Sequence, residues 1–194
     1  RDGPAALRGR LRVDVPTGVA RDLVVPRLRE FFREHPELTL ELSSTDRRVD
    51  VIREGFDCVL RAGPIADESV VFRTIGAYEM VNCASADYVA ARGKPRRIAE
   101  LADHVLVDYA PTFGQRSTGF EYQAGGREVS VPMRTALTVS SVDSYVGACL
   151  AGLGIVQIPS ISASPHLASG RLVELLPRHR PAPMPVSIVL PNRR

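Results

Sequence analysis

Apolar and polar residues alternate along short segments in the first third of the chain, and each such segment predicts a β-strand. These predicted strands are residues 11–15, 38–42 and 57–62. Between the first two, apolar residues recur on one side of a predicted helix, at Val19, Leu23, Leu28, Phe31 and Phe32. We expect its continuous part to run from Pro26 to His35, because a proline breaks or kinks the helix that precedes it.

A second, shorter helix is predicted between residues 46 and 55. Asp46 is a suitable N-cap, Val49 and Ile52 would face inward, and Gly55 would end the helix. Strands that alternate with helices across short turns favour a parallel sheet covered by helices.

The remaining residues predict a second set of strands and helices. Ser85 and Ser141 are N-caps of helices that end at Gly93 and Gly152, and Gly125-Gly126 indicates a hairpin. A further helix covers 98–102, and the other strands are 105–109, 136–140, 171–175 and 186–190. Two long apolar stretches, 70–84 (interrupted only by Gly76) and 154–159, are predicted to cross between two lobes. Lobe I would then hold residues 1–80 and 160–194, and lobe II residues 81–159.

Composition indicates a globular protein, with 44% hydrophobic and 24% charged residues among 194. No apolar run reaches the roughly 20 residues that span a bilayer, so we expect no membrane contact. The three cysteines lie far apart in apolar stretches, so we expect them to be small buried side chains. Unpaired cysteines also indicate a reducing compartment, the cytoplasm. The net charge of +3 comes from dispersed arginines, and aromatic residues make up only 6%. We therefore expect this segment not to contact DNA itself.

Two polar segments, Thr17-Gly18 and Ser140-Ser141, lie where a predicted strand runs into a helix. Hydroxyls, backbone N–H groups and the positive end of the helix dipole would converge there, which suits a carboxylate or phosphate. Ordinary helix capping is the alternative, and it is the favoured interpretation for either segment taken alone. Ser44 and Thr45 end a strand at the edge where open α/β sheets bind ligands, although a local turn would also account for them.

Catalytic motifs are missing from the sequence. None of the four histidines lies in a nucleophile motif, and no Walker loop, GxSxG, GxGxxG, HExxH or CxxC occurs. We expect no enzyme activity, no cofactor and no metal site.

Several segments, in order, resemble LysR-type transcription regulators. They are DRRVDVIREGFDCVLRAGPIADESVVFRTIG (46–76), CASADYVAARGKPRRIAELADH (83–104), LAGLGIVQIP (150–159), GRLVELLP (170–177) and IVLPNRR (188–194). The resemblance implies a type 2 periplasmic-binding-protein fold: two Rossmann-like α/β lobes joined by two crossing strands, with a small-molecule effector between them. It implies effector contacts at Pro16, Thr17, Gly18, Ser44, Thr45, Pro111, Thr112, Phe113, Ser140, Ser141 and Val142.

The resemblance also implies a homodimer or homotetramer, for which the helix from Pro26 to His35 is the candidate contact. A winged helix-turn-helix before this segment would bind DNA, and a final helix would follow it. The expected function is that of a regulatory domain that senses a small molecule such as an organic acid. The alternative is a solute-binding protein of a transporter, which has the same fold.

Overall fold

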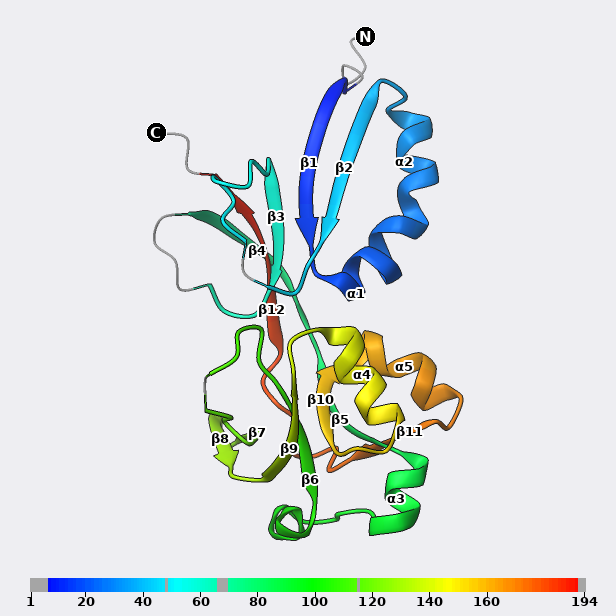
Figure 1. The fold of residues 1–194 in the computed structure, drawn as a ribbon, viewed down its shortest axis with the longest axis vertical. Coiled ribbons are helices and arrows are strands. Elements are labelled where there is room, and N and C mark those ends of the chain that lie inside the picture. The colour runs from blue at the N-terminus through cyan, green and yellow to red at the C-terminus, as the bar shows by residue number, and fades with distance from the viewer. Residues whose placement is uncertain (1–6, 48, 66–69, 115, 192–194) are drawn as a thin grey trace. The chain divides into compact units, whose positions relative to one another are not determined.

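The computed structural model describes residues 7–47, 49–65, 70–114 and 116–191. The chain divides into two compact units, which we call lobe 1 (residues 1–76 and 185–194) and lobe 2 (residues 77–184). It passes from one to the other along β4 (Val71–Tyr78) and returns along β12 (Met184–Leu190) (Figure 1). The expected two-lobed α/β architecture with two crossing strands is therefore confirmed.

The second crossing lies later in the chain than the sequence predicted. The stretch expected to cross, 154–159, contains β10 (Val156–Pro159), which stays within lobe 2 and pairs with β5 (Met80–Ser85). Residues 172–175 also belong to lobe 2, because β11 (Leu172–Leu175) pairs with the other edge of β5. Residues 160–184 thus join lobe 2 and not lobe 1. An apolar pattern shows that a strand is buried, but it does not show which sheet buries it.

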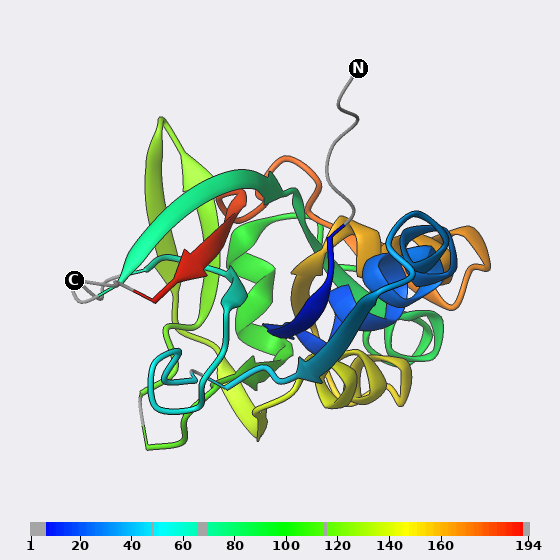
Figure 2. The ribbon, with the colours of Figure 1, turned by 90° about the horizontal axis from the view of Figure 1, so that it is seen from above.

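Lobe 1 is built on a five-stranded sheet in the order β2-β1-β3-β12-β4. β1 (Gly9–Val15) lies parallel to both β2 (Leu38–Ser44) and β3 (Cys58–Ala62), as the predicted alternation of strands and helices required. β12 pairs antiparallel with β3, and Figure 2 shows β12 beside the long curved β4. The carboxyl ends of β1, β2 and β3 therefore meet at one edge of the sheet.

The helical segment after β1 begins at Thr17, nine residues before the expected start at Pro26. It consists of α1 (Thr17–Val19), a π-helical turn (Ala20–Val24), a 3-10 turn (Val25–Arg27) and α2 (Leu28–Glu34). Proline lacks an N–H group, and its ring clashes with the carbonyl one regular turn earlier. The change of helical type around Pro26 relieves that conflict, so the segment continues without a break and runs back along β2 (Figure 1).

The prediction of a short helix between residues 46 and 55 is wrong. The described residues there form only turns at Val51–Gly55, and Ile52 is exposed while Val51 is buried. Gly55 does have the left-handed backbone expected of a helix stop, with φ of +69°. The Asp46 carboxylate, expected as the N-cap of this helix, instead accepts a hydrogen bond from the backbone N–H of Thr17 at 3.0 Å.

Lobe 2 combines three sets of strands. β5 is the centre of the antiparallel sheet β10-β5-β11. β6 (Val105–Tyr109) is parallel to β9 (Arg134–Val139), and a bridge from Leu106 to Ile155 joins β6 to the start of β10. β7 (Phe120–Ala124) and β8 (Arg127–Val131) form the expected hairpin, because Gly125 and Gly126 supply the positive φ angles that its tight turn requires.

The helices of lobe 2 mostly begin where the sequence predicted. The Ser85 and Ser141 hydroxyls accept from backbone N–H groups of α3 (Ala86–Arg92) and α4 (Val142–Leu150), so both caps are confirmed. Residues Ile98–Asp103 form a 3-10 helix rather than an α-helix. α5 (Ser160–Ala168) was missed, because its small residues and Pro165 make a weak helical pattern.

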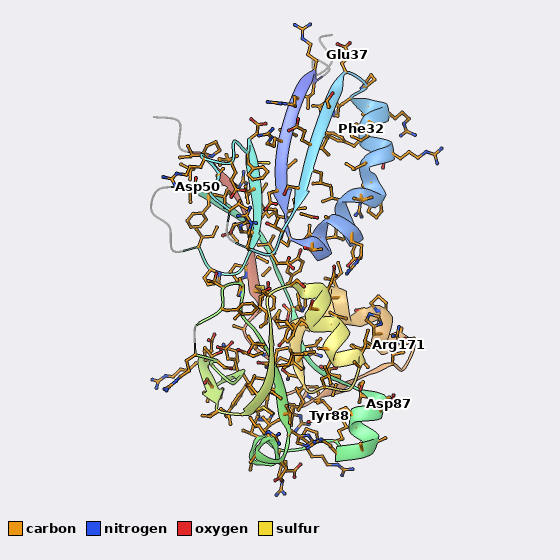
Figure 3. The ribbon with its side chains drawn as sticks, in the orientation of Figure 1. Phe32, Glu37, Asp50, Asp87, Tyr88 and Arg171 are labelled. Atoms are coloured by element: carbon orange, nitrogen blue, oxygen red, sulfur yellow. The ribbon has the colours of Figure 1, made fainter. Side chains whose placement is uncertain are left out.

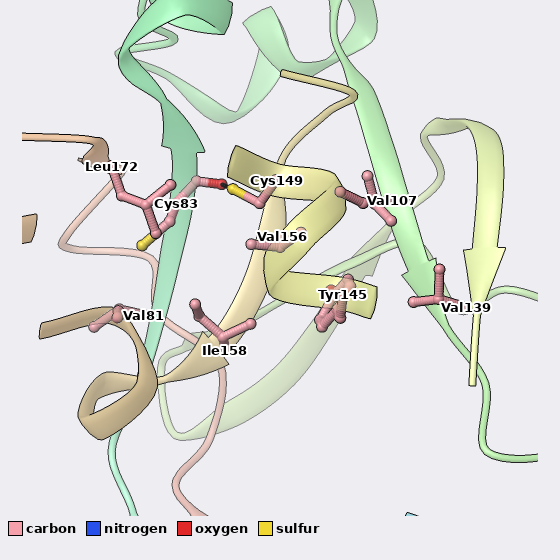
Figure 4. Packing of buried hydrophobic residues seen from close by; sticks show 11 residues of the cluster. Val81, Cys83, Val107, Val139, Tyr145, Cys149, Val156, Ile158 and Leu172 are labelled. Atoms are coloured by element: carbon pink, nitrogen blue, oxygen red, sulfur yellow. Dashed lines mark hydrogen bonds between the residues drawn. The ribbon is translucent and has the colours of Figure 1, made fainter. Parts of the chain in front are cut away.

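The buried interior lies mainly in lobe 2. Figure 4 shows side chains of α4 packed against β5, β6, β9 and β10, with Tyr145 and Cys149 among them. The Cys149 thiol lies 3.7 Å from the Cys83 carbonyl oxygen, and burial raises the pKa of both thiols to about 12. These two cysteines are fully buried small side chains, as expected, whereas Cys58 in lobe 1 is only half-buried. Among the described residues, no helix is long and apolar enough to cross a membrane.

Candidate functional site

The predicted site residues of lobe 1 lie together at the carboxyl ends of β1 and β2. Val15 stands opposite Ser44 in the parallel register, and the backbone N–H of Thr45 donates to the Val15 carbonyl at 3.1 Å. The segment Pro16 to Gly18 therefore starts beside Ser44 and Thr45. The position matches the edge of an α/β sheet at which ligands bind.

The backbone N–H of Thr17 is not free to bind a ligand anion. It donates to the Asp46 carboxylate at 3.0 Å, so an acid from the protein's own chain already occupies the start of this helical segment. The expected convergence of free N–H groups at Thr17-Gly18 is thus reduced, because the sequence did not show that the turn after β2 brings Asp46 back to β1. Asp46 itself was predicted only as a helix cap.

Sequence reasoning missed a buried polar cluster beneath these segments. Asp14 is fully buried at the end of β1, and its Oδ2 atom lies 3.0 Å from Nη1 of Arg61 on β3. The Thr45 hydroxyl lies 3.2 Å and 3.3 Å from the two oxygens of Asp14. The signal available in the sequence was a charged residue next to the last residue of each strand, Asp14 in LRVDV and Arg61 in CVLRA.

The predicted site residues of lobe 2 also lie together. The backbone N–H of Ala110 donates to the Val139 carbonyl at 2.9 Å, which joins the ends of the parallel strands β6 and β9. The loop with Pro111, Thr112 and Phe113 therefore starts beside the segment Ser140 to Val142. Phe113 is 64% exposed, which is unusual for an aromatic side chain.

The Ser141 hydroxyl serves the helix that it precedes. Its oxygen accepts from the backbone N–H of Ser144 at 3.2 Å, and its proton goes to the Ser144 hydroxyl at 2.9 Å. The capping alternative that the sequence left open therefore describes this side chain. Below it, Tyr145 is buried, and its hydroxyl accepts from the backbone N–H of Gln157 at 3.1 Å. Burial raises the pKa of Tyr145, which keeps its hydroxyl neutral.

The chain matches the LysR substrate binding domain family over residues 4–194. It belongs to this family.

The relatives of this LysR domain are transcription regulators and not enzymes. The chain is 43% identical over 189 residues to an uncharacterized HTH-type transcriptional regulator of Escherichia coli K12, YhjC, and covers 63% of that protein. It is 28% identical over 188 residues to the E. coli K12 regulator PgrR, covering 96% of this chain and 62% of the relative. The chain thus spans less than two thirds of the length of these curated relatives.

Solved structures confirm the two-lobed fold of the LysR domain. The regulatory domain of CrgA, a LysR-type regulator from Neisseria meningitidis, matches with a TM-score of 0.80 and 26% identity. The match covers 96% of this chain and 90% of that structure. The regulatory domain of AphB from Vibrio vulnificus matches with a TM-score of 0.69 and 25% identity, over 96% of this chain and 91% of that structure.

Acidic groups accompany the candidate segments of this LysR domain in both lobes. Asp14 and Asp46 lie in lobe 1, and in lobe 2 the Asp108 carboxylate accepts from the Ser117 hydroxyl at 2.9 Å while Asp143 lies in the first turn of α4. Among the described residues, no group of three or more His, Cys, Asp or Glu side chains has the geometry to hold a metal ion.

Proposed function

We propose that this domain is the ligand sensor of a LysR-type transcription regulator and binds one small organic effector. The observation that carries the proposal is that each lobe brings two separate polar segments together at the carboxyl ends of parallel strands. Pro16, Thr17, Gly18, Ser44 and Thr45 form the lobe 1 part, and Pro111, Thr112, Phe113, Ser140, Ser141 and Val142 form the lobe 2 part.

An organic acid is the proposed effector class. The positive end of the α4 dipole and the Ser140 hydroxyl favour a carboxylate near the start of α4. The exposed Phe113 ring offers an apolar surface for the rest of a small ligand. Asp143 lies in the first turn of α4, and its charge would repel a second carboxylate of the ligand. The proposed effector is therefore an acid with a single carboxylate.

Binding would act by shifting the population of lobe arrangements. An effector that binds one arrangement more tightly favours it, and the change would be transmitted to an N-terminal winged helix-turn-helix that binds DNA. The regulator would work in the cytoplasm, where its DNA is. The names of the relatives favour this function over that of a transporter's solute-binding protein.

The test is a thermal-shift and calorimetry screen of the domain against small carboxylic acids. Saturation at 100 times the dissociation constant adds about 2.7 kcal/mol to the free energy of unfolding. Ser140→Ala and Phe113→Ala should weaken any ligand found, whereas Thr138→Val, on the exposed side of β9, should not. A ligand that binds all three variants as tightly as the wild type would refute the proposed site.

We also propose that the domain associates as a homodimer or homotetramer through the edge strand β2 and the helical segment beside it. Val25 and Phe32 in that segment are 52% and 36% exposed, and Figure 3 marks Phe32 on α2. Phe32→Asp should lower the molar mass measured by light scattering to that of a monomer. Ile161→Asp removes a similarly exposed apolar residue from α5 in lobe 2 and should leave the mass unchanged.

A further inference from the structure

The buried cluster of Asp14, Thr45 and Arg61 in lobe 1 contains more hydrogen-bonding capacity than it uses. Arg61 Nη1 and the Thr45 hydroxyl both contact the same oxygen, Asp14 Oδ2, at 3.0 Å and 3.2 Å. Nη1 also donates to the Leu60 carbonyl at 3.1 Å. The second terminal nitrogen, Nη2, is buried and has no acceptor among the described residues.

An unpaired guanidinium N–H is costly inside a protein, because it has lost water without gaining an acceptor. Arg61 holds this unpaired nitrogen while only 17% of its side chain is exposed. Arg61 lies near the carboxyl end of β3, beside the end of β1 and close to Thr45. This is the edge of the sheet where α/β proteins bind ligands. A ligand bound at this edge would supply the acceptor that Nη2 lacks.

Thr45 contributes an acceptor beside this donor. A threonine hydroxyl has one proton and two lone pairs. The two oxygens of Asp14 accept from the Thr45 hydroxyl, so the Thr45 proton points to Asp14. The lone pairs of the Thr45 oxygen are then the groups that it can offer to a ligand, next to the N–H groups of Arg61.

Charge decides between the ligand groups that could fit here. The single positive charge of Arg61 is already balanced by Asp14, and the Asp46 carboxylate lies on the Thr17 N–H of the same edge. A carboxylate would add a third negative charge and could only accept, so it would leave the Thr45 lone pairs unmatched. A hydroxyl or a primary amide accepts from Arg61, donates to Thr45 and adds no charge.

We infer that Arg61 and Thr45 form a subsite in lobe 1 that recognises an uncharged hydroxyl or primary amide group of the effector and selects against a carboxylate there. The inference rests on the proposed function and adds to it the chemistry of the effector's second polar group. The effector sought is therefore an acid that also carries a hydroxyl or primary amide group.

The test uses two matched series of acids that differ only in the terminal group. The aliphatic series is 4-hydroxybutyrate, succinamate, succinate and butyrate. The aromatic series is 4-(hydroxymethyl)benzoate, 4-carbamoylbenzoate, terephthalate and 4-methylbenzoate. In at least one series, the wild-type domain should bind the hydroxyl and amide members about tenfold tighter than the carboxylate and methyl members, as measured by calorimetry.

Variants show whether the two residues create that preference. Arg61→Lys keeps a positive charge opposite Asp14 but removes the second terminal nitrogen, and Thr45→Val removes the lone pairs. Both should reduce the tenfold preference to less than about twofold while the affinity for the methyl member stays the same. Thr45→Ser should retain the preference. Arg33→Lys and Thr39→Val, exposed positions of lobe 1, are the matched controls and should also retain it.

The outcomes separate this inference from the proposed function. If carboxylate or methyl members bind as well as hydroxyl and amide members, or if the variants weaken all four members equally, the subsite is refuted while the sensor function stands. If no member of either series binds, the proposed organic-acid effector is refuted, and the subsite with it. Should Arg61→Lys fail to fold, the comparison of Thr45→Val with Thr45→Ser decides the question.

Discussion

Tyr88 of α3 is expected to stabilise lobe 2 through its hydroxyl rather than through its ring alone. The hydroxyl oxygen accepts from the backbone N–H of Val105 at 2.9 Å and lies 3.1 Å from Nδ1 of His104. The hydroxyl has one proton and two lone pairs, so it can accept from Val105 and still hydrogen-bond to Nδ1, where either atom can be the donor. Both side chains are nearly inaccessible, at 4% exposed for Tyr88 and 5% for His104, and Figure 3 marks Tyr88 on α3.

Tyr88→Phe retains the aromatic ring and removes only the hydroxyl. Two buried groups, the Val105 N–H and His104 Nδ1, then lose this partner. Leaving a buried polar group unsatisfied costs about 1–3 kcal/mol. Allowing for some relaxation around the two groups, we expect the free energy of unfolding to fall by about 2–4 kcal/mol.

Urea denaturation measures this loss. With a slope of about 2 kcal/mol per molar urea, the midpoint should fall by about 1–2 M. Tyr122→Phe is the matched control, because the Tyr122 ring packs in the same lobe and its hydroxyl has no hydrogen-bond partner among the described residues. Its midpoint should change by less than about 0.3 M. A Tyr88→Phe midpoint equal to that of the control, at an unchanged slope, would refute the reasoning.

Three further predictions follow from the same lobe. Burial lowers the pKa of His104, so the unfolded chain binds a proton at this side chain more tightly than the folded chain does. The stability that depends on neutral His104 is therefore fully present above pH ~6.5, the pKa of an unperturbed histidine, and is lost as the pH falls through the lower folded pKa. Asparagine does not titrate and keeps a hydrogen-bonding side chain beside Tyr88, so His104→Asn should lose less stability than the wild type between about pH 8 and pH 5. Equal losses in two urea denaturation series would contradict this assignment. Ser141→Ala removes the cap of α4 and should cost about 1 kcal/mol in urea denaturation, with full retention of stability counting against the cap. Gly154→Ala would place a Cβ 2.7 Å from the Val105 carbonyl oxygen and should lower the free energy of unfolding by more than about 2 kcal/mol. Gly76→Ala is the control, because no atom lies within 4 Å of the added carbon, and it should change the melting temperature little. Similar effects at both glycines would refute the steric argument.

Local chemistry accounts for the elements that the sequence predicted well. The hairpin at Gly125-Gly126 and the caps at Ser85 and Ser141 depend on the conformational freedom or the hydroxyl of one residue and on neighbours within three positions. β1, β2 and β3 follow from the alternation of residues within each strand. The interacting residues are close neighbours in the chain, so a short stretch of sequence contains both partners of each interaction.

Tertiary structure decided the features whose partners lie far apart in the chain. Pro26 was expected to interrupt the helix, but a local change of helical type accommodates it. Strand 172–175 belongs to lobe 2 only because β5, almost 90 residues earlier, pairs with it.

The candidate site also has a part that the sequence determined and a part that only the fold determined. The sequence by itself determined which polar segments end the strands, because such segments follow apolar runs directly. Only the fold determined that Asp46 occupies the Thr17 N–H and that Arg61 meets Asp14 across 47 positions, with one nitrogen left unpaired. Hydrogen bonding and ion pairing act over a few ångströms, so the chemistry of a site built from distant segments is set by the register of the strands that carry them.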